Sequence, residues 1–494
     1  MKILLSLSLP FLLLYFTETF AQQNDNVMVL GYRYGTNGPI PKLDFSYGDP
    51  DTGVYYSPID IFLGNASICD SNGIMMMYTN GIFLVNRFQQ IIPGSTDFNI
   101  DSVNTAYNLT SYNVSQIAII VPAPGQSGLY YIFHTGLQTF PNNVIQPSVL
   151  SYSTVDMNMN GGSGQMILKQ QPVVSIPLSF SSLQAVKHAN GRDWWIVVHQ
   201  YNSNSFISSL VTPSGIQPSI LSSTGPIIET GSNGQSTFSP DGTRYAYADN
   251  ERNYLAIFSF DRCTGIFTYD TIVRKSVNAS GINFSGCSFS PNNQFLYASD
   301  LMHLYQYDVT VTDIPSSEKL IATADLVPDP FLSYFNHHCS GPDGKIYFST
   351  GNSCAHLHVI NEPNLADTNC NFVQHQQKII NYGNTVPNFP NYRLGAMGGL
   401  VCDSLPTIIA NEANLNKKIK VYPNPASTSL FIESENISSD YSQLEITSID
   451  GKTLLQEEFH SKKEIDISSF PEGIYFISIK HENYIEYSYL TVAH

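Results

Sequence analysis

A short run late in the chain, Cys354-Ala-His356-Leu-His358, places three possible metal ligands at alternate positions. Alternate side chains of a β-strand point to the same face, so these three would lie together. A His-x-His pair on a strand can hold one metal ion, and a thiolate two residues away would add a softer ligand. The competing interpretation is an ordinary strand whose polar face meets water. We favour that interpretation and expect no bound metal and no other cofactor.

The same cysteine is a disulfide candidate. The chain has seven cysteines, an odd number that leaves at least one thiol unpaired. Cys354 and Cys370 bracket a stretch that reads as strand, loop and strand, which makes them the preferred pair, although the sequence leaves open whether they join. A disulfide between them would remove the thiolate from the metal candidate.

Other reactive constellations are missing from the sequence. There is no G-x-S-x-G elbow, P-loop, C-x-x-C, H-E-x-x-H or EF-hand pattern. Asp241 and Asp343 occupy turns in which an aspartate caps its own backbone. Trp194 and Trp195 are adjacent on an expected strand, where a place in the core is favoured over a sugar-stacking role. We therefore predict no catalytic and no cofactor-binding residue.

The elements that carry these residues repeat along the chain. A hairpin with a tight polar turn recurs at intervals of 52, 67, 51, 51 and 51 residues, measured between Asp70, Pro122, Ala189, Pro240, Pro291 and Pro342. About four strands in each repeat of about fifty residues are typical of a β-propeller. We predict an all-β chain with about seven four-stranded blades over residues 27–404. Strands in Val27–Gly48 are expected to complete the blade begun by Gly395–Ser404, which would close the ring.

Composition and charge exclude some classes of binding partner and indicate where the protein acts. Only 13% of residues are charged and the net charge is −17, which argues against binding to nucleic acid or to anionic lipid. Residues 1–21 have a basic start, an apolar stretch and a small-residue cleavage site, and so predict a signal peptide. No other run is long and apolar enough for a transmembrane segment. We expect an exported protein.

The end of the chain does not follow the repeat of the preceding region. A polar linker is expected over residues 405–417, followed by short alternating strands over 418–494 that predict a small antiparallel β-sandwich. The runs "KVYPNPASTSLFIE", "LEITSIDGKTLLQEE" and "EIDISSFPEGIYFISI" occur there in order. This region resembles the type A C-terminal sorting domain of the bacterial type IX secretion system. The residues that carry the resemblance include Tyr422, Pro423, Asn424, Pro425, Gly473 and Tyr475.

The resemblance implies a route. The chain would pass through the periplasm and the outer membrane to the cell surface or the extracellular space, recognised by the type IX machinery and clipped by its sortase-like peptidase. The repeat region resembles an uncharacterised family of bacterial propellers, which implies a fold and no activity.

Two functions remain open from the sequence. The first is an extracellular binding protein for a glycan or a protein, because a propeller presents a broad face of loops and no reactive set is legible. The alternative is an extracellular enzyme acting on a polysaccharide or another polymer at the propeller axis. Converging carboxylates or histidines at the axis would favour the enzyme, and a funnel of serine and asparagine would favour the binding protein.

Overall fold

The chain divides into two compact units, Met1–Leu405 and Pro406–His494. A computed structural model describes residues 22–31, 38–107, 111–140, 144–228, 234–276, 283–398, 402, 420–434, 442–448, 453–480 and 485–493. The predicted signal peptide (1–21) and linker (405–417) lie outside the described residues.

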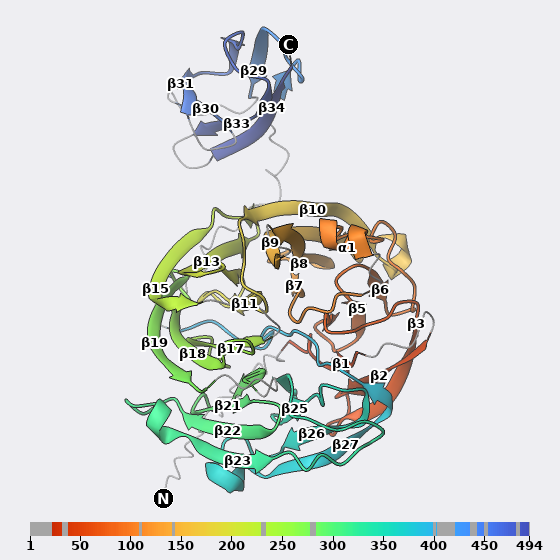
Figure 1. Cartoon of the computed structure of the whole chain (residues 1–494). Helices are drawn as coiled ribbons and strands as arrows, with labels where there is room; N and C mark the ends of the chain where they lie inside the picture. The colour runs from red at the N-terminus through yellow and green to blue at the C-terminus, as the bar shows by residue number, and fades with distance from the viewer. Residues whose placement is uncertain are drawn as a thin grey trace, which may run out of the picture. The chain divides into compact units, whose positions relative to one another are not determined.

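The described part of the first unit contains seven antiparallel sheets, which we call blades one to seven (Figure 1). Blade one comprises β1 (Val27–Val29), β2 (Gly38–Asp44) and β3 (Asp51–Ser57). Blade two comprises β4 (Ala66–Cys69), β5 (Met75–Thr79) and β6 (Leu84–Asn86). Blade three comprises β7 (Ala118–Pro122), β8 (Leu129–Phe140), β9 (Val144–Asp156) and β10 (Gln165–Ser175). Blade four comprises β11 (Gln184–Lys187), β12 (Trp194–His199), β13 (Ser203–Thr212), β14 (Gly215–Ile216) and β15 (Ile220–Ile228).

The remaining blades follow the same order. Blade five comprises β16 (Gln235–Phe238), β17 (Arg244–Asp249), β18 (Tyr254–Asp261) and β19 (Ile266–Arg274). Blade six comprises β20 (Gly286–Phe289), β21 (Phe295–Ser299), β22 (His303–Asp308) and β23 (Lys319–Thr323). Blade seven comprises β24 (His338–Ser340), β25 (Ile346–Phe348), β26 (Cys354–Ile360) and β27 (Phe372–Gly383). Short helical pieces are α1 (Ser102–Tyr107), η2 (Asn160–Gly162), η3 (Pro315–Ser317) and η4 (Asp367–Cys370).

The blades form a closed ring, as the sequence repeat predicts. The first strand of each blade touches the first strand of the next from β1 to β24, and the ring closes where β27 packs against β2 and β3. Middle strands are buried on both faces because each blade packs between two neighbours. On β21, Phe295 and Tyr297 pack toward blade seven, whereas Leu296 and Ala298 pack toward blade five. The predicted β-propeller is confirmed.

Closure of the ring differs from the sequence prediction. Strands from Val27 onward form a sheet of their own, blade one, and residues 395–398 belong to no strand, so these residues do not begin the shared blade that the sequence predicts. Of the rest of Gly395–Ser404, residues 399–401, 403 and 404 lie outside the described residues. After β27, residues 384–398 instead run across the middle of the ring as an extended segment, which we call the axial strap (Figure 1). Pro387 and Pro390 lack backbone donors, which opposes pairing of this segment into a sheet.

The axial strap is anchored at several points. Near its start, Thr385 forms an isolated bridge with Gly31. Further along, Arg262 on the β18–β19 turn donates a 2.6 Å hydrogen bond to the carbonyl of Gly395. Beyond the strap, Cys402 forms a disulfide with Cys263 on the same turn. The strap is thereby fixed to blades one and five.

The second unit consists of two small antiparallel sheets. One contains β28 (Lys420–Tyr422), β29 (Ser429–Glu433) and β32 (Lys462–Asp466). The other contains β30 (Ser442–Ser448), β31 (Thr453–Phe459), β33 (Gly473–Lys480) and β34 (Ile485–Val492). Alternate apolar residues of both sheets, such as Leu430, Ile432, Leu444 and Ile446, meet in one core.

Candidate functional site

A cavity of about 270 Å³ lies at the axis of the propeller. Its walls come from the first strands of blades four to seven and from the axial strap, which supplies Pro387–Asn391 and Arg393. Loops and strands from separate blades meet here, so the ring itself assembles this site. We call it the axial cavity.

Amide side chains form one part of the cavity lining. Asn388 of the strap accepts hydrogen bonds at its Oδ1 from Gln116 Nε2 (3.1 Å) and Gln184 Nε2 (2.8 Å). Its Nδ2 donates to the carbonyls of Ala118 and Leu183, both at 3.2 Å. Asn388 therefore joins the strap to the innermost strands of blades three and four.

A second amide links blades five, six and seven. Gln235 on β16 accepts the backbone N–H groups of Cys287 and His338, each at 3.1 Å, and donates to the carbonyl of His338 at 2.7 Å. Ser288 on β20 donates to the same carbonyl at 3.1 Å. The amides at the axis thus spend most of their hydrogen-bonding capacity on holding neighbouring blades together.

Apolar rings form the other part of the lining. Phe238, Phe289 and Phe389 contribute aromatic surface, and Pro240, Pro291 and Pro342 contribute the prolines of three repeated turns. Phe238 and Phe389 are partly exposed, whereas Phe289 is buried. Because the same turn recurs in each repeat, the sequence pattern places equivalent prolines around one end of the axis.

Charged groups in the lining are few and already paired. Among the lining residues the carboxylate is Asp25, and Arg393 holds it with Nε at 3.0 Å from both oxygens and Nη2 at 2.8 Å from Oδ1. The histidine of the lining is His338, whose Nδ1 lies 2.8 Å from Ser288 Oγ. Burial lowers the pKa of His338 to about 3, so its ring is neutral near pH 7. This lining lacks the two free carboxylates that glycoside hydrolysis needs.

The structure buries the His-x-His pair of the sequence analysis. His356 and His358 lie on β26 at 1% and 0% exposure, and Ser333 and Phe335 of the β23–β24 loop contact their rings, so the expected solvated strand face is wrong. Cys354 starts the same strand and is also buried, and its Sγ contacts the carbonyl of Phe331 at 3.4 Å. Burial raises the pKa of Cys354, which disfavours the thiolate that would bind a metal.

The preferred disulfide is not formed. Cys354 and Cys370 are both free thiols, and the cystine of the described residues joins Cys263 to Cys402. The reason lies in the register of β26 and β27, in which Cys354 is opposite Gly383 whereas Cys370 lies just before the other end of the pair. Six residues of strand separate those ends by roughly 20 Å, well beyond disulfide reach.

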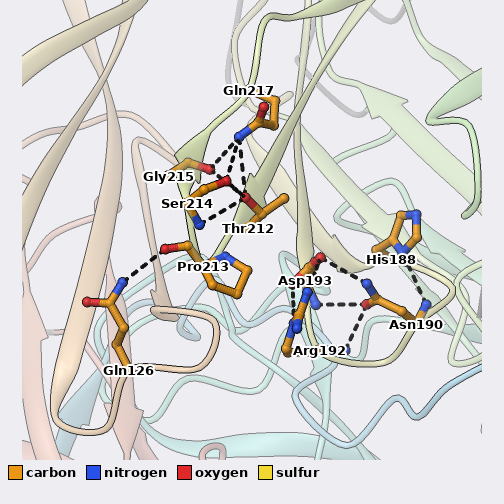
Figure 2. Close-up of polar contacts among 10 residues, drawn as sticks. All are labelled: Gln126, His188, Asn190, Arg192, Asp193, Thr212, Pro213, Ser214, Gly215 and Gln217. Atoms are coloured by element: carbon orange, nitrogen blue, oxygen red, sulfur yellow. Dashed lines mark hydrogen bonds and ion pairs between the residues drawn. The ribbon is translucent and has the colours of Figure 1, made fainter. Parts of the chain in front are cut away.

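The two tryptophans singled out from the sequence, and His188 shortly before them, have structural roles. Trp194 and Trp195 are 1% and 2% exposed and pack toward opposite neighbouring blades, which confirms their place in the core. His188 accepts the backbone N–H of Asn190 at Nδ1 and faces the carbonyl of Cys263 with Nε2. Figure 2 shows this turn, in which Asn190 Oδ1 also accepts the backbone N–H of Asp193.

The structure adds residues that sequence reasoning missed. The axial amides Gln116, Gln184, Gln235 and Asn388 were not singled out, nor was His375 on β27. Gln184 and Gln235 each stand five residues before a repeat marker, Ala189 and Pro240, so the repeat itself carried a signal for them. His375 has no such signal because its position depends on a local irregularity of β27.

The predicted sorting motif begins with a turn on the second unit. Tyr422 ends β28, and cis peptide bonds precede both Pro423 and Pro425. Asn424 between them accepts the backbone N–H of Thr491 at 2.8 Å. The turn is therefore attached to β34, the last strand.

The other two motif residues lie on β33. Gly473 begins this strand, and Tyr475 is 4% exposed in the core of the unit. The hydroxyl of Tyr475 donates to the carbonyl of Pro471 at 2.6 Å, and its ring packs on Phe470. The motif residues thus hold the unit together at the base of β33.

Residues 420–492 match the family model described as the secretion system C-terminal sorting domain. The C-terminal unit is a sorting domain of this family. It confirms the resemblance read from the sequence, and it indicates handling by the type IX machinery and export through the outer membrane to the cell surface or the extracellular space. No helix of the described residues has the length and apolar character needed to cross a membrane.

Solved structures of low sequence identity are similar in fold to parts of this chain. A protein from Lactobacillus plantarum is 13% identical with a TM-score of 0.42, covering 74% of this chain and 99% of that chain. A periplasmic gluconolactonase from Pseudomonas aeruginosa is 12% identical with a TM-score of 0.36, covering 89% and 98%. A β-propeller domain from Myceliophteria thermophila is 10% identical with a TM-score of 0.36, covering 67% and 93%. No curated protein matches the sequence.

Proposed function

We propose that the exported propeller is an extracellular binding protein whose ligand occupies the axial cavity. The observation that carries this proposal is the chemistry of the lining, where aromatic and proline surface stands beside amides, Ser340 and the Arg393–Asp25 pair. Polar and apolar groups share this lining about evenly, and a concave site in which aromatic faces stand beside placed polar groups is typical of small-molecule binding. Because Asp25 is paired and His338 is neutral and held by Ser288, the lining favours binding over acid–base chemistry.

The size and chemistry of the cavity favour part of a glycan as the ligand. A volume of about 270 Å³ is at the small end for ligand sites and suits one or two sugar rings. Partly exposed Phe238 and Phe389 offer faces on which the C–H side of a sugar can stack, while Asn391 and Ser340 offer partners for hydroxyl groups.

A substitution that obstructs the cavity tests this proposal. Ser340 lines the cavity and is exposed, so in Ser340→Trp the indole occupies the opening without replacing a core residue. The matched control is Ser214→Trp, an exposed serine in the β13–β14 turn outside the cavity (Figure 2).

The measurement is binding of the full chain to immobilised oligosaccharides of glucose, galactose, mannose and N-acetylglucosamine, followed by calorimetry on the best ligand. We expect Ser340→Trp to weaken binding at least tenfold and Ser214→Trp to leave it unchanged. Binding that survives Ser340→Trp would place the ligand elsewhere. Absence of binding to every sugar, with binding to an immobilised peptide library that Ser340→Trp abolishes, would replace the glycan by a protein segment.

A further inference from the structure

Three histidines gather on the outer half of blade seven. His356 and His358 on β26 meet His375 on β27, and one nitrogen of each lies within 4.8 Å of the others. This is the group of possible metal ligands found among the described residues, and it lies outside the lining of the axial cavity. Cys354 does not belong to it.

An irregularity in β27 delivers the third histidine. Leu357 pairs with Gln377 and Val359 pairs with Val373, so a single residue of β26, His358, faces three residues of β27. His375 is the middle one of those three and has φ of 59°, a left-handed conformation that few residues other than glycine adopt. Bulges of this kind often redirect a side chain near a functional site, and here the bulge turns the His375 ring toward His356.

Flanking carboxylates fix which nitrogen of each ring carries the proton. His356 Nδ1 lies 2.9 Å from Asp329 Oδ2, and His375 Nε2 lies 2.9 Å from both oxygens of Asp325. Each of these nitrogens must donate, which leaves a lone pair on His356 Nε2 and on His375 Nδ1 in the neutral rings. Those two atoms face each other at 2.5 Å. Two lone pairs so close repel each other unless a cation stands between them.

His358 has a different role from His356 and His375. Its Nδ1 accepts the backbone N–H of His375 at 3.0 Å, so in the neutral ring Nε2 carries the proton and points to Ser333 Oγ at 2.9 Å. With no lone pair directed at the others, His358 holds the bulge of β27 in place and is a positioning residue. Ser333, 1% exposed, also contacts His356 Nε2 at 3.2 Å.

We propose that His356 Nε2 and His375 Nδ1 bind one divalent transition-metal ion of the class that prefers imidazole, Zn²⁺ or Cu²⁺. Carboxylates on the far nitrogens of both rings are the usual support of metal-binding histidines. Metal–nitrogen distances of about 2.0 Å require the two nitrogens to stand roughly 3.3 Å apart. His356 Nε2 and His375 Nδ1 are 2.5 Å apart, so the bulge at His375 has to shift by less than about 1 Å to admit the ion. The ion joins β26 to β27 and keeps two positions for water or a ligand atom.

Charge and access agree with this assignment. Asp325 and Asp329 bring negative charge to the site, which attracts a cation. The side chains of Asp325, Asp329 and His375 are 38%, 54% and 24% exposed, so an ion reaches the site from solvent. The sequence-based expectation of no metal considered β26 alone and did not include the bulge that carries His375.

Metal binding by the full chain, purified without a histidine tag and stripped with EDTA, tests the proposal. One equivalent of ZnCl₂ or CuCl₂ is added, with CaCl₂ as the control ion, and retained metal is measured after dialysis together with the calorimetric titration. We expect about one Zn²⁺ or Cu²⁺ per chain and no retained Ca²⁺, because imidazole is a poor ligand for calcium.

Variants separate this site from adventitious binding. His375→Gln and Asp325→Asn both replace partly exposed side chains, and we expect at least tenfold weaker Zn²⁺ binding in the first and a smaller loss in the second. The matched control is His303→Gln, because His303 is also partly exposed and paired with an aspartate, Asp300, but on blade six. Circular dichroism of the metal-free variants checks that they fold. Failure of the parent to retain Zn²⁺ or Cu²⁺, or equal retention by His375→Gln, would overturn the proposal and leave a proton shared between the two rings.

Discussion

The side chain of Asn388 joins the axial strap to the ring by hydrogen bonds. Removing this side chain tests whether the strap stabilises the propeller. The side chain takes part in four hydrogen bonds, two accepted from Gln116 and Gln184 and two donated to the carbonyls of Ala118 and Leu183. A hydrogen bond contributes roughly 0.5–1.5 kcal/mol net. Both glutamine amides keep a second bond to the carbonyl of Ser236, which limits the loss. Asn388→Ala should therefore lower the free energy of unfolding by about 2–4 kcal/mol.

Tryptophan fluorescence during guanidinium unfolding measures this loss. The two tryptophans of the chain, Trp194 and Trp195, are buried in blade four, so the signal reports on the propeller and not on the sorting domain. The control is Asn361→Ala, which removes side-chain hydrogen bonds to Asn371 and Gln376 at the surface and should cost less than about 0.5 kcal/mol. A change of less than about 0.5 kcal/mol in Asn388→Ala would refute the claim that the axial strap stabilises the propeller.

Two further predictions concern the disulfide and pH. Reduction of Cys263–Cys402 opens a loop of 139 residues and should lower the free energy of unfolding by up to about 5 kcal/mol. The measurement is the guanidinium midpoint, which should drop on adding dithiothreitol. The midpoint of Cys263→Ala should not respond to the reductant, and a drop there would contradict the assignment of this disulfide. Burial lowers the pKa of His134, His199 and His338 to about 3, whereas histidine in the unfolded chain titrates near pH 6.5. The unfolded state therefore binds more protons below pH 6.5, and each histidine should reduce stability by about 1.4 kcal/mol per pH unit as the pH falls toward 3. Asp249 acts in the opposite direction, since burial raises its pKa to about 7, but three histidines outweigh it. The melting temperature should fall from pH 7 to pH 5, and a constant or rising value would contradict the three buried neutral rings.

The fold was predictable because the propeller repeats one local pattern. Hairpins such as Cys287–Ser299 carry alternating apolar residues and a tight turn, and their regular spacing already indicates blades before any long-range contact is known. Ring closure was not predictable in the same way. Residues 384–398 have no repeat counterpart, and their place is set by single contacts such as Asn388 with Gln184, which no local pattern encodes.

The candidate sites also combine features that the sequence predicts with features that it does not. The His356-x-His358 spacing and the turn prolines Pro240, Pro291 and Pro342 were visible as sequence features. Their environment was not predictable. The burial of His356 and His358 depends on Ser333 and Phe335 of the β23–β24 loop, and the bulge that brings in His375 depends on the register between β26 and β27. Likewise the cysteine pair Cys263–Cys402 joins segments that only the closed ring brings together.

Fractionation of a producing cell tests most directly the central claim, that binding and delivery are carried by separate units. In a host with the type IX apparatus, the full chain is compared with a chain that stops at residue 405, using protease accessibility of intact cells and of the periplasmic fraction. The account predicts that the full chain appears at the surface or in the medium, whereas the truncated chain stays in the periplasm with its propeller folded, as circular dichroism of the recovered protein shows. A truncated chain that still reaches the surface would contradict the account.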